Sequence, residues 1–417
     1  MTRAWVLHPD IQSDRDRRDP GPALDEAMGL ALALPGLSVI GGDVVRLPRP
    51  HPGQLFGTGK SEELAARFKA EEIGLVLVDG PVSPVQQRNL EKQWGVKLLD
   101  RTGLILEIFS DRARTREGVM QVEMAHLSYQ RTRLVRAWTH LERQRGGLGF
   151  VGGPGETQIE ADRRAIDEQL NRLKKQLDKV VRTRELHRAA RAKVPFPIVA
   201  LVGYTNAGKS TLFNRLTGAD VMVEDMLFAT LDPTMRGVEL AGNTKVILSD
   251  TVGFISDLPT QLVAAFRATL EEVLSADLIL HVRDVSHPGT EDQAHDVARI
   301  LEDLGISNEV PLIEVWNKTD ALPPESRDAV ERLSERRTEV QTMSALTGDG
   351  MDELIAAITR TLDDERARKV IRLPFAAGKR RAWLYDQGVV EDESQEENGL
   401  ALTVNWTARQ ARTFHDL

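Results

Sequence analysis

The chain has 417 residues, which is long enough for two to four domains at roughly 150 residues each. Its composition, 41% hydrophobic and 28% charged residues, is ordinary for a globular protein, and the lack of cysteine excludes a disulfide framework. The net charge of −9 argues against a chain that binds nucleic acid over its whole surface. No apolar stretch reaches the roughly 20 residues of a membrane span, and the N-terminus lacks a signal-peptide pattern, so we expect a cytoplasmic protein.

Residues 1–110 alternate short apolar runs with helical patterns, which predicts a small α/β domain with a largely parallel sheet. The expected strands are Ala4–Leu7, Val39–Val45, Leu75–Val78 and Val96–Leu98, and the expected helices are Ala23–Leu34, Glu62–Ala70 and Pro84–Trp94.

The segment Gly57–Ser61 ends in Gly-Lys-Ser, as a phosphate-binding loop does. The first glycine of such a loop would be residue 54, which is Gln54, and no strong apolar strand leads into the segment. We therefore expect a helix N-terminus capped by Ser61 or Thr58, with a weak second nucleotide site as the minority alternative.

Residues 111–195 have a different character, with apolar positions at near-heptad spacing on both sides of a glycine cluster. The stripe consists of Met120, Met124, Leu127, Leu134, Trp138 and Leu141, and then of Ile159, Ile166, Leu170, Leu173, Leu177 and Val180. The pattern predicts an antiparallel helical hairpin with its tip at Gly146–Gly155, and Arg131 interrupts the first stripe. The Pro-containing segment Val194–Pro197 marks a domain boundary.

The hairpin is also the basic part of the chain. Residues 111–193 carry 19 Lys and Arg against 11 Asp and Glu, a local balance of +8 that leaves −17 for the rest. A basic arm of this kind fits contact with a polyanion, and on charge alone a solvated helical surface fits equally well.

Residues 196–365 again alternate strands and helices and contain a phosphate-loop motif, GxxxxGKS, between a buried strand at Ile198–Val202 and an apolar helix. Glycines let backbone N–H groups and the helix N-terminus face phosphate. Lys209 would reach the β- and γ-phosphates, and the Ser210 hydroxyl would bind Mg²⁺. The nucleotide-binding residues expected here are Gly203, Tyr204, Thr205, Asn206, Ala207, Gly208, Lys209, Ser210 and Thr211.

A DxxG motif follows the strand Val246–Leu248 and begins 41 residues after Lys209. Asp250 would hold Mg²⁺, usually through water, and the Gly253 amide would contact the γ-phosphate. The expected contact residues are Asp250, Thr251, Val252 and Gly253.

A guanine-selective motif, NKxD, follows the strand Leu312–Trp316. The Asp320 carboxylate can accept from the guanine N1–H and exocyclic amine together, a pair that adenine does not offer. Asn317 would join this loop to the phosphate loop, and Lys318 would pack over the base. Ser344, Ala345 and Leu346 would form the last base-binding turn, with the Ala345 N–H facing the guanine O6. The motifs predict a GTPase.

Residues 366–417 form a short C-terminal module, for which we expect α+β structure. Arg381–Tyr385 and Leu400–Val404 are interpreted as strands around an acidic loop, Glu391–Glu397. The predicted fold class is therefore α/β: a P-loop GTPase domain preceded by a small α/β domain and a helical hairpin, and followed by this module.

The chain resembles HflX, a bacterial GTPase family of the Obg–HflX group, over most of its length. The resemblance rests on GYTNAGKS, FATLDPT, DTVGFI, NKTD and, most specifically, on the glycine-rich segment Gly146–Arg164. It implies association with the large ribosomal subunit, with splitting or rescue of stalled ribosomes, and contact of the hairpin with ribosomal RNA. It further implies a Mg²⁺-dependent GTP hydrolase, which we expect to be monomeric.

The segment FATLDPT would report the γ-phosphate, through Phe228, Ala229 and Thr230. Spacing in related bacterial GTPases favours Thr230, 21 residues after Lys209, as a Mg²⁺ ligand beside Ser210 and Asp250, with Thr234 as the alternative. Lys209, Thr230 and Gly253 are the expected catalytic residues.

Ras-like enzymes orient the attacking water with a glutamine just after DxxG, and here that residue is Phe254. We therefore expect slow intrinsic hydrolysis that a partner or an ion accelerates. Asn206 either recruits K⁺, as in some related GTPases, or hydrogen-bonds within its own loop. Docking on a ribosome is the second way in which the site would be completed and hydrolysis accelerated.

Two other functions fit the sequence. One is a GTP-dependent switch that binds a protein effector, with the hairpin as a dimerising coiled coil. The other is an RNA-remodelling ATPase that also uses the N-terminal domain, which the incomplete motif at Gly57–Ser61 disfavours.

Overall fold

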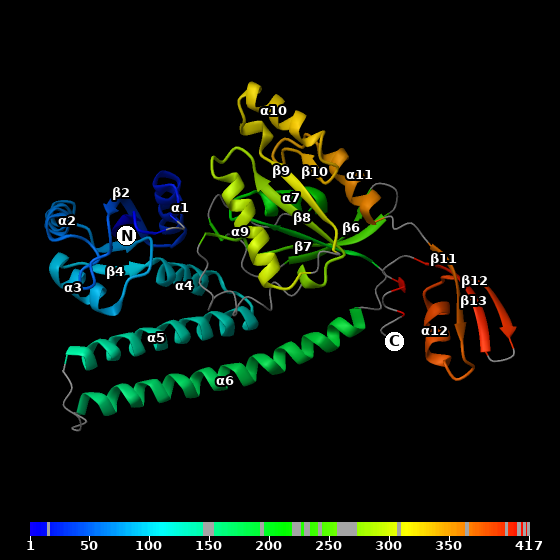
Figure 1. The fold of residues 1–417 in the computed structure, drawn as a ribbon, viewed down its shortest axis with the longest axis horizontal. Coiled ribbons are helices and arrows are strands. Elements are labelled where there is room, and N and C mark those ends of the chain that lie inside the picture. Colours follow the sequence, from blue (N-terminus) through cyan, green and yellow to red (C-terminus); the bar gives the residue numbers. More distant parts are fainter. Residues whose placement is uncertain are drawn as a thin grey trace. The chain divides into compact units, whose positions relative to one another are not determined.

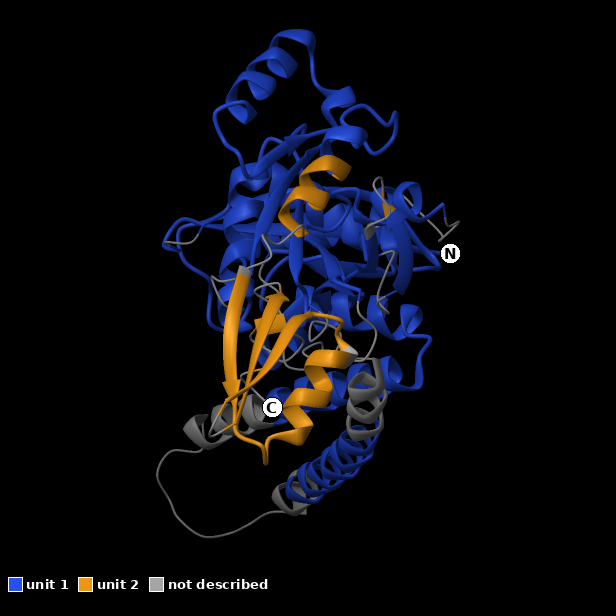
Figure 2. Cartoon of the chain, turned by 90° about the vertical axis from the view of Figure 1, so that its right-hand side faces the viewer, with its two compact units in different colours: residues 1–239, 245–354 blue, residues 240–244, 355–417 orange. Residues whose placement is uncertain are grey.

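The computed structural model divides the chain into two compact units, residues 1–239 with 245–354, and residues 240–244 with 355–417 (Figure 2). The described backbone comprises residues 1–14, 17–144, 154–191, 196–218, 227–228, 234–240, 244–256, 273–306, 310–362, 367–396, 399–406, 410–411 and 414.

The first unit begins with a four-stranded parallel sheet in the order β2-β1-β3-β4 (Figure 1). Its elements are β1 (Thr2–Ile11), α1 (Pro20–Ala33), β2 (Leu37–Leu47), α2 (Thr58–Ala70), β3 (Leu75–Val78), α3 (Pro84–Trp94), β4 (Lys97–Asp100) and α4 (Arg101–Arg112). The expected α/β alternation is confirmed. Helix α4 is additional, because its apolar run follows β4 without a break and only the Asp100 cap on the Gly103 N–H separates the two elements.

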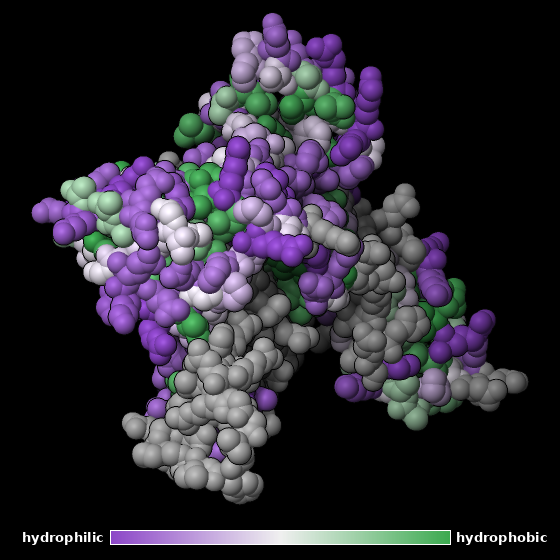
Figure 3. Space-filling view, turned by 60° about the vertical axis from the view of Figure 1, so that its left-hand side comes forward, coloured by the Kyte–Doolittle hydropathy of each residue, from purple (hydrophilic) through white to green (hydrophobic). Residues whose placement is uncertain are grey.

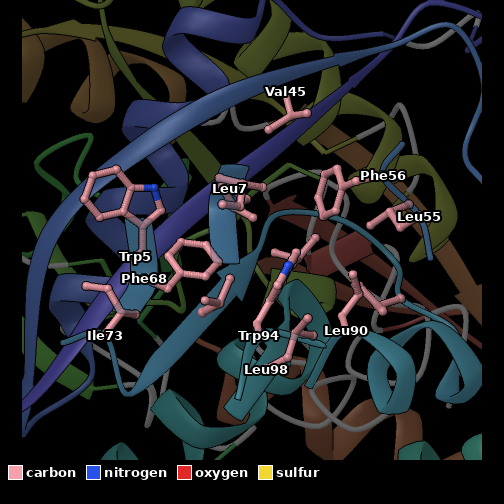
Figure 4. Close-up of a cluster of buried hydrophobic side chains, with 14 of the residues drawn as sticks. Trp5, Leu7, Val45, Leu55, Phe56, Phe68, Ile73, Leu90, Trp94 and Leu98 are labelled. Atoms are coloured by element: carbon pink, nitrogen blue, oxygen red, sulfur yellow. The ribbon is translucent and has the colours of Figure 1, made fainter. Parts of the chain in front are cut away.

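Aromatic and aliphatic side chains from the sheet and from α2 and α3 form the core of this domain (Figure 4). The Trp94 ring lies between Phe56 and Phe68, with ring centroids 5.9 and 5.2 Å apart. Its indole N–H donates to the carbonyl of Ser61 at 3.0 Å, so that α2 and α3 are joined by a buried hydrogen bond.

The Gly57–Ser61 segment contains the first turn of helix α2. Helix α2 begins at Thr58 after Gly57, with no side-chain cap, so the expected cap by Ser61 or Thr58 is wrong. Ser61 is instead fully buried in the first turn, and its hydroxyl donates to Gln93 on α3 at 2.9 Å. Packing against α3 directs this hydroxyl inward, away from the helix N-terminus.

Two long helices follow, α5 (Arg116–Gln144) and α6 (Pro154–Arg191), which lie side by side as an antiparallel hairpin (Figure 1). Arg131, which interrupts the apolar stripe, pairs with Asp167 of the opposite helix at 2.8 Å. Tyr129 on α5 donates to Asp100 at 2.7 Å, which joins the hairpin to the carboxyl end of β4. Residues 146–153 of the glycine-rich tip lie outside the described residues, and its last two residues, Pro154 and Gly155, begin α6.

The third part of this unit contains a six-stranded sheet in the order β10-β9-β8-β5-β7-β6, whose pairings from β10 to β7 are parallel. The strands are β5 (Ile198–Gly203), β6 (Thr234–Leu240), β7 (Thr244–Asp250), β8 (Leu278–Asp284), β9 (Leu312–Asn317) and β10 (Val340–Thr342). The helices are α7 (Lys209–Thr217), α9 (Thr290–Asp303), a 3₁₀ turn at Thr319–Ala321, α10 (Pro324–Ser334) and α11 (Met351–Leu362), the last of which continues into the second unit. Parallel strands bring all their carboxyl ends to one edge, where ligands bind in open α/β sheets.

The second unit contains an antiparallel sheet in the order β11-β13-β12 with its own buried core. Its elements are β11 (Ala367–Leu373), α12 (Gly378–Asp386), β12 (Val390–Glu396) and β13 (Gly399–Trp406). Two expectations are wrong: Arg381–Tyr385 is helical, and most of the acidic segment Glu391–Glu397 is a strand. The strand forms by antiparallel pairing with β13, and two ion pairs accompany it: Glu393 with Arg381 at 2.9 Å, and Glu391 with Arg368 at 2.7 Å.

Hydrophilic residues predominate over the described surface on the face drawn in Figure 3, with hydrophobic residues in smaller patches between them. Among the described residues, no helix combines the length and the hydropathy that a bilayer crossing requires.

Candidate nucleotide site

The phosphate-loop motif occupies the turn between the central strand β5 and helix α7. Gly208 has φ +95°, and an added Cβ would lie 2.2 Å from Nδ2 of Asn317, so only glycine fits. Asn206 also has a positive φ, +58°, and is exposed. The turn therefore has the backbone conformation and the strand–loop–helix context that anion binding requires.

Lys209 is buried inside this loop, with 6% of its surface exposed. Its ammonium donates to the carbonyls of Gly203 at 3.0 Å and Tyr204 at 2.8 Å. Burial lowers the pKa of Lys209 to about 8, against the opposing effect of the Asp250 carboxylate. The loop thus holds a cation at the point where the motif predicts phosphate.

Two oxygen ligands of the type that Mg²⁺ prefers lie beside this lysine. The Ser210 hydroxyl donates to Oδ2 of Asp250 at 2.7 Å, and Asp250 is fully buried at the carboxyl end of β7. A hydroxyl and a carboxylate that converge in this way are oxygen donors that would hold Mg²⁺ next to a bound phosphate.

The DxxG segment packs directly on the phosphate loop. The N–H of Thr205 donates to the Phe254 carbonyl at 2.7 Å, and the N–H of Phe254 donates to the Gly203 carbonyl at 3.1 Å. A Cβ on Gly253 would lie 2.9 Å from Cα of Thr205 and 3.1 Å from Nζ of Lys209. Backbone contact this close requires glycine. The Phe254 side chain is 2% exposed and cannot hydrogen-bond a water.

The base-side loops are joined through Asn317, which is 1% exposed at the end of β9. Its Nδ2 donates to the Ala207 carbonyl at 2.8 Å, and its Oδ1 accepts from the Ala345 N–H at 2.8 Å. The expected link from Asn317 to the phosphate loop is therefore present in the structure. The Ala345 N–H, expected to face the guanine O6, is directed instead to Asn317, because the amide side chain lies between the two loops.

Asp320 is exposed in the 3₁₀ turn after β9, where its carboxylate is accessible to a base. The preceding Lys318 has φ +65°, an unfavourable conformation for a residue with a side chain, and its ammonium lies 2.8 Å from Asp284. Ser344 is fully buried, whereas Leu346 is 72% exposed. The structure thus gathers the NKxD motif and the Ser344–Leu346 turn at one end of the sheet.

The segment expected to sense the γ-phosphate is described only at its edges. Phe228 is buried with φ +58°, and its ring meets Phe109 of α4 edge-on at 4.6 Å. Thr234, the alternative metal ligand, begins β6 and is half-buried. Ala229 and Thr230 lie outside the described residues, so the role of Thr230 stays a prediction.

A buried polar cluster next to the phosphate loop was missed by sequence reasoning. The Tyr204 hydroxyl donates to Glu26 of α1 and accepts from the Ser256 N–H. Arg101 pairs with Glu26 and Asp79 and donates to the Ser256 carbonyl at 2.8 Å. The signal that was available is that Asp79 and Arg101 directly follow β3 and β4, at the carboxyl edge of the first sheet.

Neighbouring charges control ionisation in this cluster. Burial opposes ionisation of Asp79, but the hydrogen bond from His8 and the positive charges of Arg101 and Arg18 lower its pKa to about 2. Burial and the Glu26 carboxylate raise the pKa of the Tyr204 phenol, so the phenol keeps its proton and donates it. Asp79 is therefore ionised and Tyr204 neutral at pH 7.

Four family models match successive parts of the chain. They are described as GTP-binding GTPase N-terminal (residues 22–110), GTP-binding GTPase Middle Region (112–191), 50S ribosome-binding GTPase (198–318) and HflX C-terminal domain (329–416).

Curated proteins similar to the chain are described as GTPase HflX. The protein from Magnetococcus marinus is 49% identical over 96% of this chain and 90% of its own length. The protein from Escherichia coli is 43% identical over 95% and 91%, and that from Caldanaerobacter subterraneus is 42% identical over 98% and 95%. The chain therefore belongs to the HflX family of GTPases and is a P-loop GTP hydrolase.

Proposed function

We propose that GTP binds across the edge formed by the phosphate loop, the DxxG segment, the NKxD motif and the Ser344–Leu346 turn. Lys209 binds the β- and γ-phosphates, the Gly253 N–H contacts the γ-phosphate, and Asp320 accepts from the guanine. The convergence of Lys209, Ser210 and Asp250 supports this assignment, because one cation and two oxygen ligands meet at the helix N-terminus.

Ser210, Asp250 and Thr230 would hold Mg²⁺. The donor set suits this ion, since it consists of a carboxylate and hydroxyls that leave room for phosphate and water. Among the described residues, no group of His, Cys, Asp and Glu side chains forms a separate metal site. Bound Mg²⁺ would neutralise charge on the β- and γ-phosphates. In hydrolysis, the role of the protein's own residues is to position the phosphates and to exclude water from the buried side of the phosphate loop.

Hydrolysis by the isolated protein should be slow, since Phe254 is buried where Ras-like enzymes place the glutamine that orients water. Asn206, exposed at the loop surface, supports K⁺ as one means of completing the site. Comparing turnover in KCl and NaCl tests its role. If turnover is faster in KCl than in NaCl and Asn206→Ala abolishes the difference, Asn206 recruits K⁺. If turnover of the wild type is the same in both salts, the alternative role of Asn206, hydrogen bonding within its loop, is favoured.

We further propose that this GTPase binds the large ribosomal subunit and splits or rescues stalled ribosomes. The single observation that carries this proposal is the match of the G domain to a 50S ribosome-binding GTPase model, in a chain that belongs to the HflX family over nearly its full length.

The basic hairpin is the proposed contact with ribosomal RNA. Its local charge is +8, and Arg172, Lys174 and Lys175 are exposed on α6. Exposed cations on a helix favour phosphate contacts, which are independent of base sequence and weaken as salt rises.

Sedimentation of purified ribosomes with GDP, GTP or a non-hydrolysable GTP analogue tests this proposal. With the non-hydrolysable analogue, we expect the protein to co-migrate with large subunits and the fraction of whole ribosomes to decrease. Lys174→Glu with Lys175→Glu should weaken co-migration at least tenfold, whereas Lys69→Glu with Lys92→Glu, which changes charge equally on the N-terminal domain, should not. Absence of the protein from every ribosomal fraction would refute the ribosomal function and leave the GTPase assignment intact.

The alternative is a GTP-dependent switch that binds a protein effector through a dimeric coiled coil. The Arg131–Asp167 pair joins α5 to α6 within one chain and so favours an intramolecular hairpin and a monomer. A dimer mass by sedimentation equilibrium after RNase treatment would instead favour the effector switch. A GTPase of this kind would act in the cytoplasm, where ribosomes and GTP occur together.

A further inference from the structure

Two charged residues outside the nucleotide motifs hold the loops that would enclose the base. Arg215 lies in the last turn of α7, and Asp284 ends strand β8. Each makes contacts to one base-side loop.

Arg215 holds the Ser344–Leu346 turn from its outer side. Its Nε donates to the Ala345 carbonyl at 2.9 Å, and one terminal nitrogen donates to the Leu346 carbonyl at 2.6 Å. The other terminal nitrogen lies so near Gly348 that a Cβ there would come within 2.3 Å of it. A planar guanidinium that donates to two successive carbonyls fixes both the position and the orientation of the turn.

Asp284 holds the NKxD loop at Lys318. One carboxylate oxygen accepts from the N–H and the hydroxyl of Ser286, at 3.0 and 2.6 Å, and the other lies 2.8 Å from the Lys318 ammonium. The carboxylate is therefore already oriented by its own turn, while β8 pairs with β9 through Asp284 and Asn317. The ion pair is largely shielded from water, with 14% and 29% of the two side chains exposed.

Local strain in Lys318 indicates that this arrangement serves the site. Its φ of +65° is unfavourable for a residue with a Cβ, and such strain persists where surrounding contacts overdetermine the conformation. Because its ammonium is anchored on Asp284, the Lys318 side chain is already ordered within the NKxD loop. A side chain ordered before binding loses less entropy when a ligand arrives.

We propose that Arg215 and Asp284 are positioning residues that set the affinity for guanine. They act through the Ser344–Leu346 turn and through Lys318, and neither is placed to contact phosphate. Their loss should weaken base binding while leaving the bound phosphates and Mg²⁺ in place. This inference rests on the proposed nucleotide site.

Steady-state GTP hydrolysis and GDP binding by the full chain test the inference. For Arg215→Ala and Asp284→Asn we expect the GTP KM and the GDP dissociation constant to rise about tenfold, with kcat within twofold of the wild type. Arg215→Lys should give an intermediate value, because an ammonium cannot donate to both carbonyls in the same fixed geometry. Arg299→Ala on α9 and Asp303→Asn, both at exposed positions, are the matched controls and should change neither constant.

Selectivity separates positioning from a purely structural role. The preference for GDP over ADP should fall at least fivefold in Arg215→Ala and Asp284→Asn, and a lower melting temperature with unchanged KM and unchanged preference would overturn the inference. Asp320→Asn is measured alongside. If it abolishes the preference while the other two variants behave as wild type, the positioning role alone is wrong, and if it has no effect, the nucleotide-site assignment itself fails.

Discussion

The phenol of Tyr204, in the phosphate loop, donates a hydrogen bond to the carboxylate of Glu26, which lies 178 residues earlier on the first helix of the N-terminal domain. The same phenol accepts from the Ser256 N–H, just after the DxxG segment, and Arg101 holds both Glu26 and the Ser256 carbonyl. The N-terminal domain is thus hydrogen-bonded to both phosphate-side elements of the site.

Removing the negative charge of Glu26 should destabilise the protein. Glu26→Gln deprives the buried Arg101 of one of its two carboxylate partners, a loss that costs several kcal/mol in buried pairs. We expect the melting temperature of the nucleotide-free chain to fall by roughly 4–8 °C for a loss of about 2 kcal/mol. Glu63→Gln, which breaks an exposed pair with Lys60, is the control and should shift it by less than about 1 °C.

A double-mutant cycle of Tyr204→Phe with Glu26→Ala isolates the contact itself, because alanine, unlike glutamine, cannot accept the phenolic hydrogen bond. Because the two side chains share one hydrogen bond, their effects on stability should be non-additive by about 1 kcal/mol. Strict additivity would mean that the phenol and the carboxylate do not interact in solution.

Replacing Gly253 should impair hydrolysis more than binding. An alanine Cβ would meet the Thr205 backbone at 2.9 Å, so the DxxG segment must move away from the phosphate loop. A small misplacement of groups in an active site can lower the rate about 100-fold. We expect single-turnover GTP hydrolysis by Gly253→Ala to fall by that factor, with GDP affinity within threefold of the wild type. Gly59→Ala, at a position with open space around it, serves as control. Wild-type turnover in Gly253→Ala would exclude this close packing in the active state.

Restoring the glutamine of Ras-like enzymes should not restore their mechanism. Phe254 is 2% exposed, so the side chain of Phe254→Gln would be buried rather than open to water. We expect basal turnover to rise by less than threefold, and the melting temperature to fall by roughly 6–12 °C for a loss of about 3 kcal/mol. Phe254→Leu, which stays apolar, should lose less stability. A tenfold gain in turnover by the glutamine variant would show that residue 254 can face the nucleotide.

Acid sensitivity should arise in part from His281, which is 5% exposed in strand β8. Burial, opposed by Glu314, and the positive charges of Arg283 and Lys209 lower its pKa to about 4. The unfolded chain binds this proton more readily than the folded chain. The stability that neutral His281 contributes is therefore fully present above the pKa of this residue in the unfolded chain, near 6.5, and is lost as the pH falls towards 4.

Protonation of His281 alone should lower the free energy of unfolding by roughly 3 kcal/mol once the pH has fallen to about 4. The urea midpoint of His281→Gln should therefore fall less between pH 7 and pH 4.5 than that of the wild type. His295→Gln, at an exposed position on α9, should follow the wild type. Identical pH profiles for His281→Gln and the wild type would mean that other groups account for the whole acid response.

The sequence alone was sufficient for the α/β class and for the order of the site elements. Periodicity located β1 to β4 and α1 to α3 of the first part, although it missed α4, and it located β5, β7 and β9 of the third part. GxxxxGKS, DxxG and NKxD each follow one of these three strands, as predicted. These features are local, since backbone conformation and the burial of an apolar run depend on residues that are near one another in the chain.

The C-terminal module shows where local reasoning failed. The acidic segment beginning at Glu391 resembles a loop in composition, yet it is strand β12, because its backbone pairs antiparallel with β13. Pairing of this kind depends on the register of an antiparallel sheet, which composition does not encode.

Only the tertiary structure decided which distant side chains meet at the nucleotide site. Arg215 with the Ala345 carbonyl, Asp284 with Lys318, and Glu26 with Tyr204 are contacts between residues 130, 34 and 178 positions apart. No sequence pattern marks them, because each depends on how separate elements pack rather than on spacing along the chain. The motifs determined what chemistry this protein performs, and the packing of its elements decided which residues hold those motifs in position.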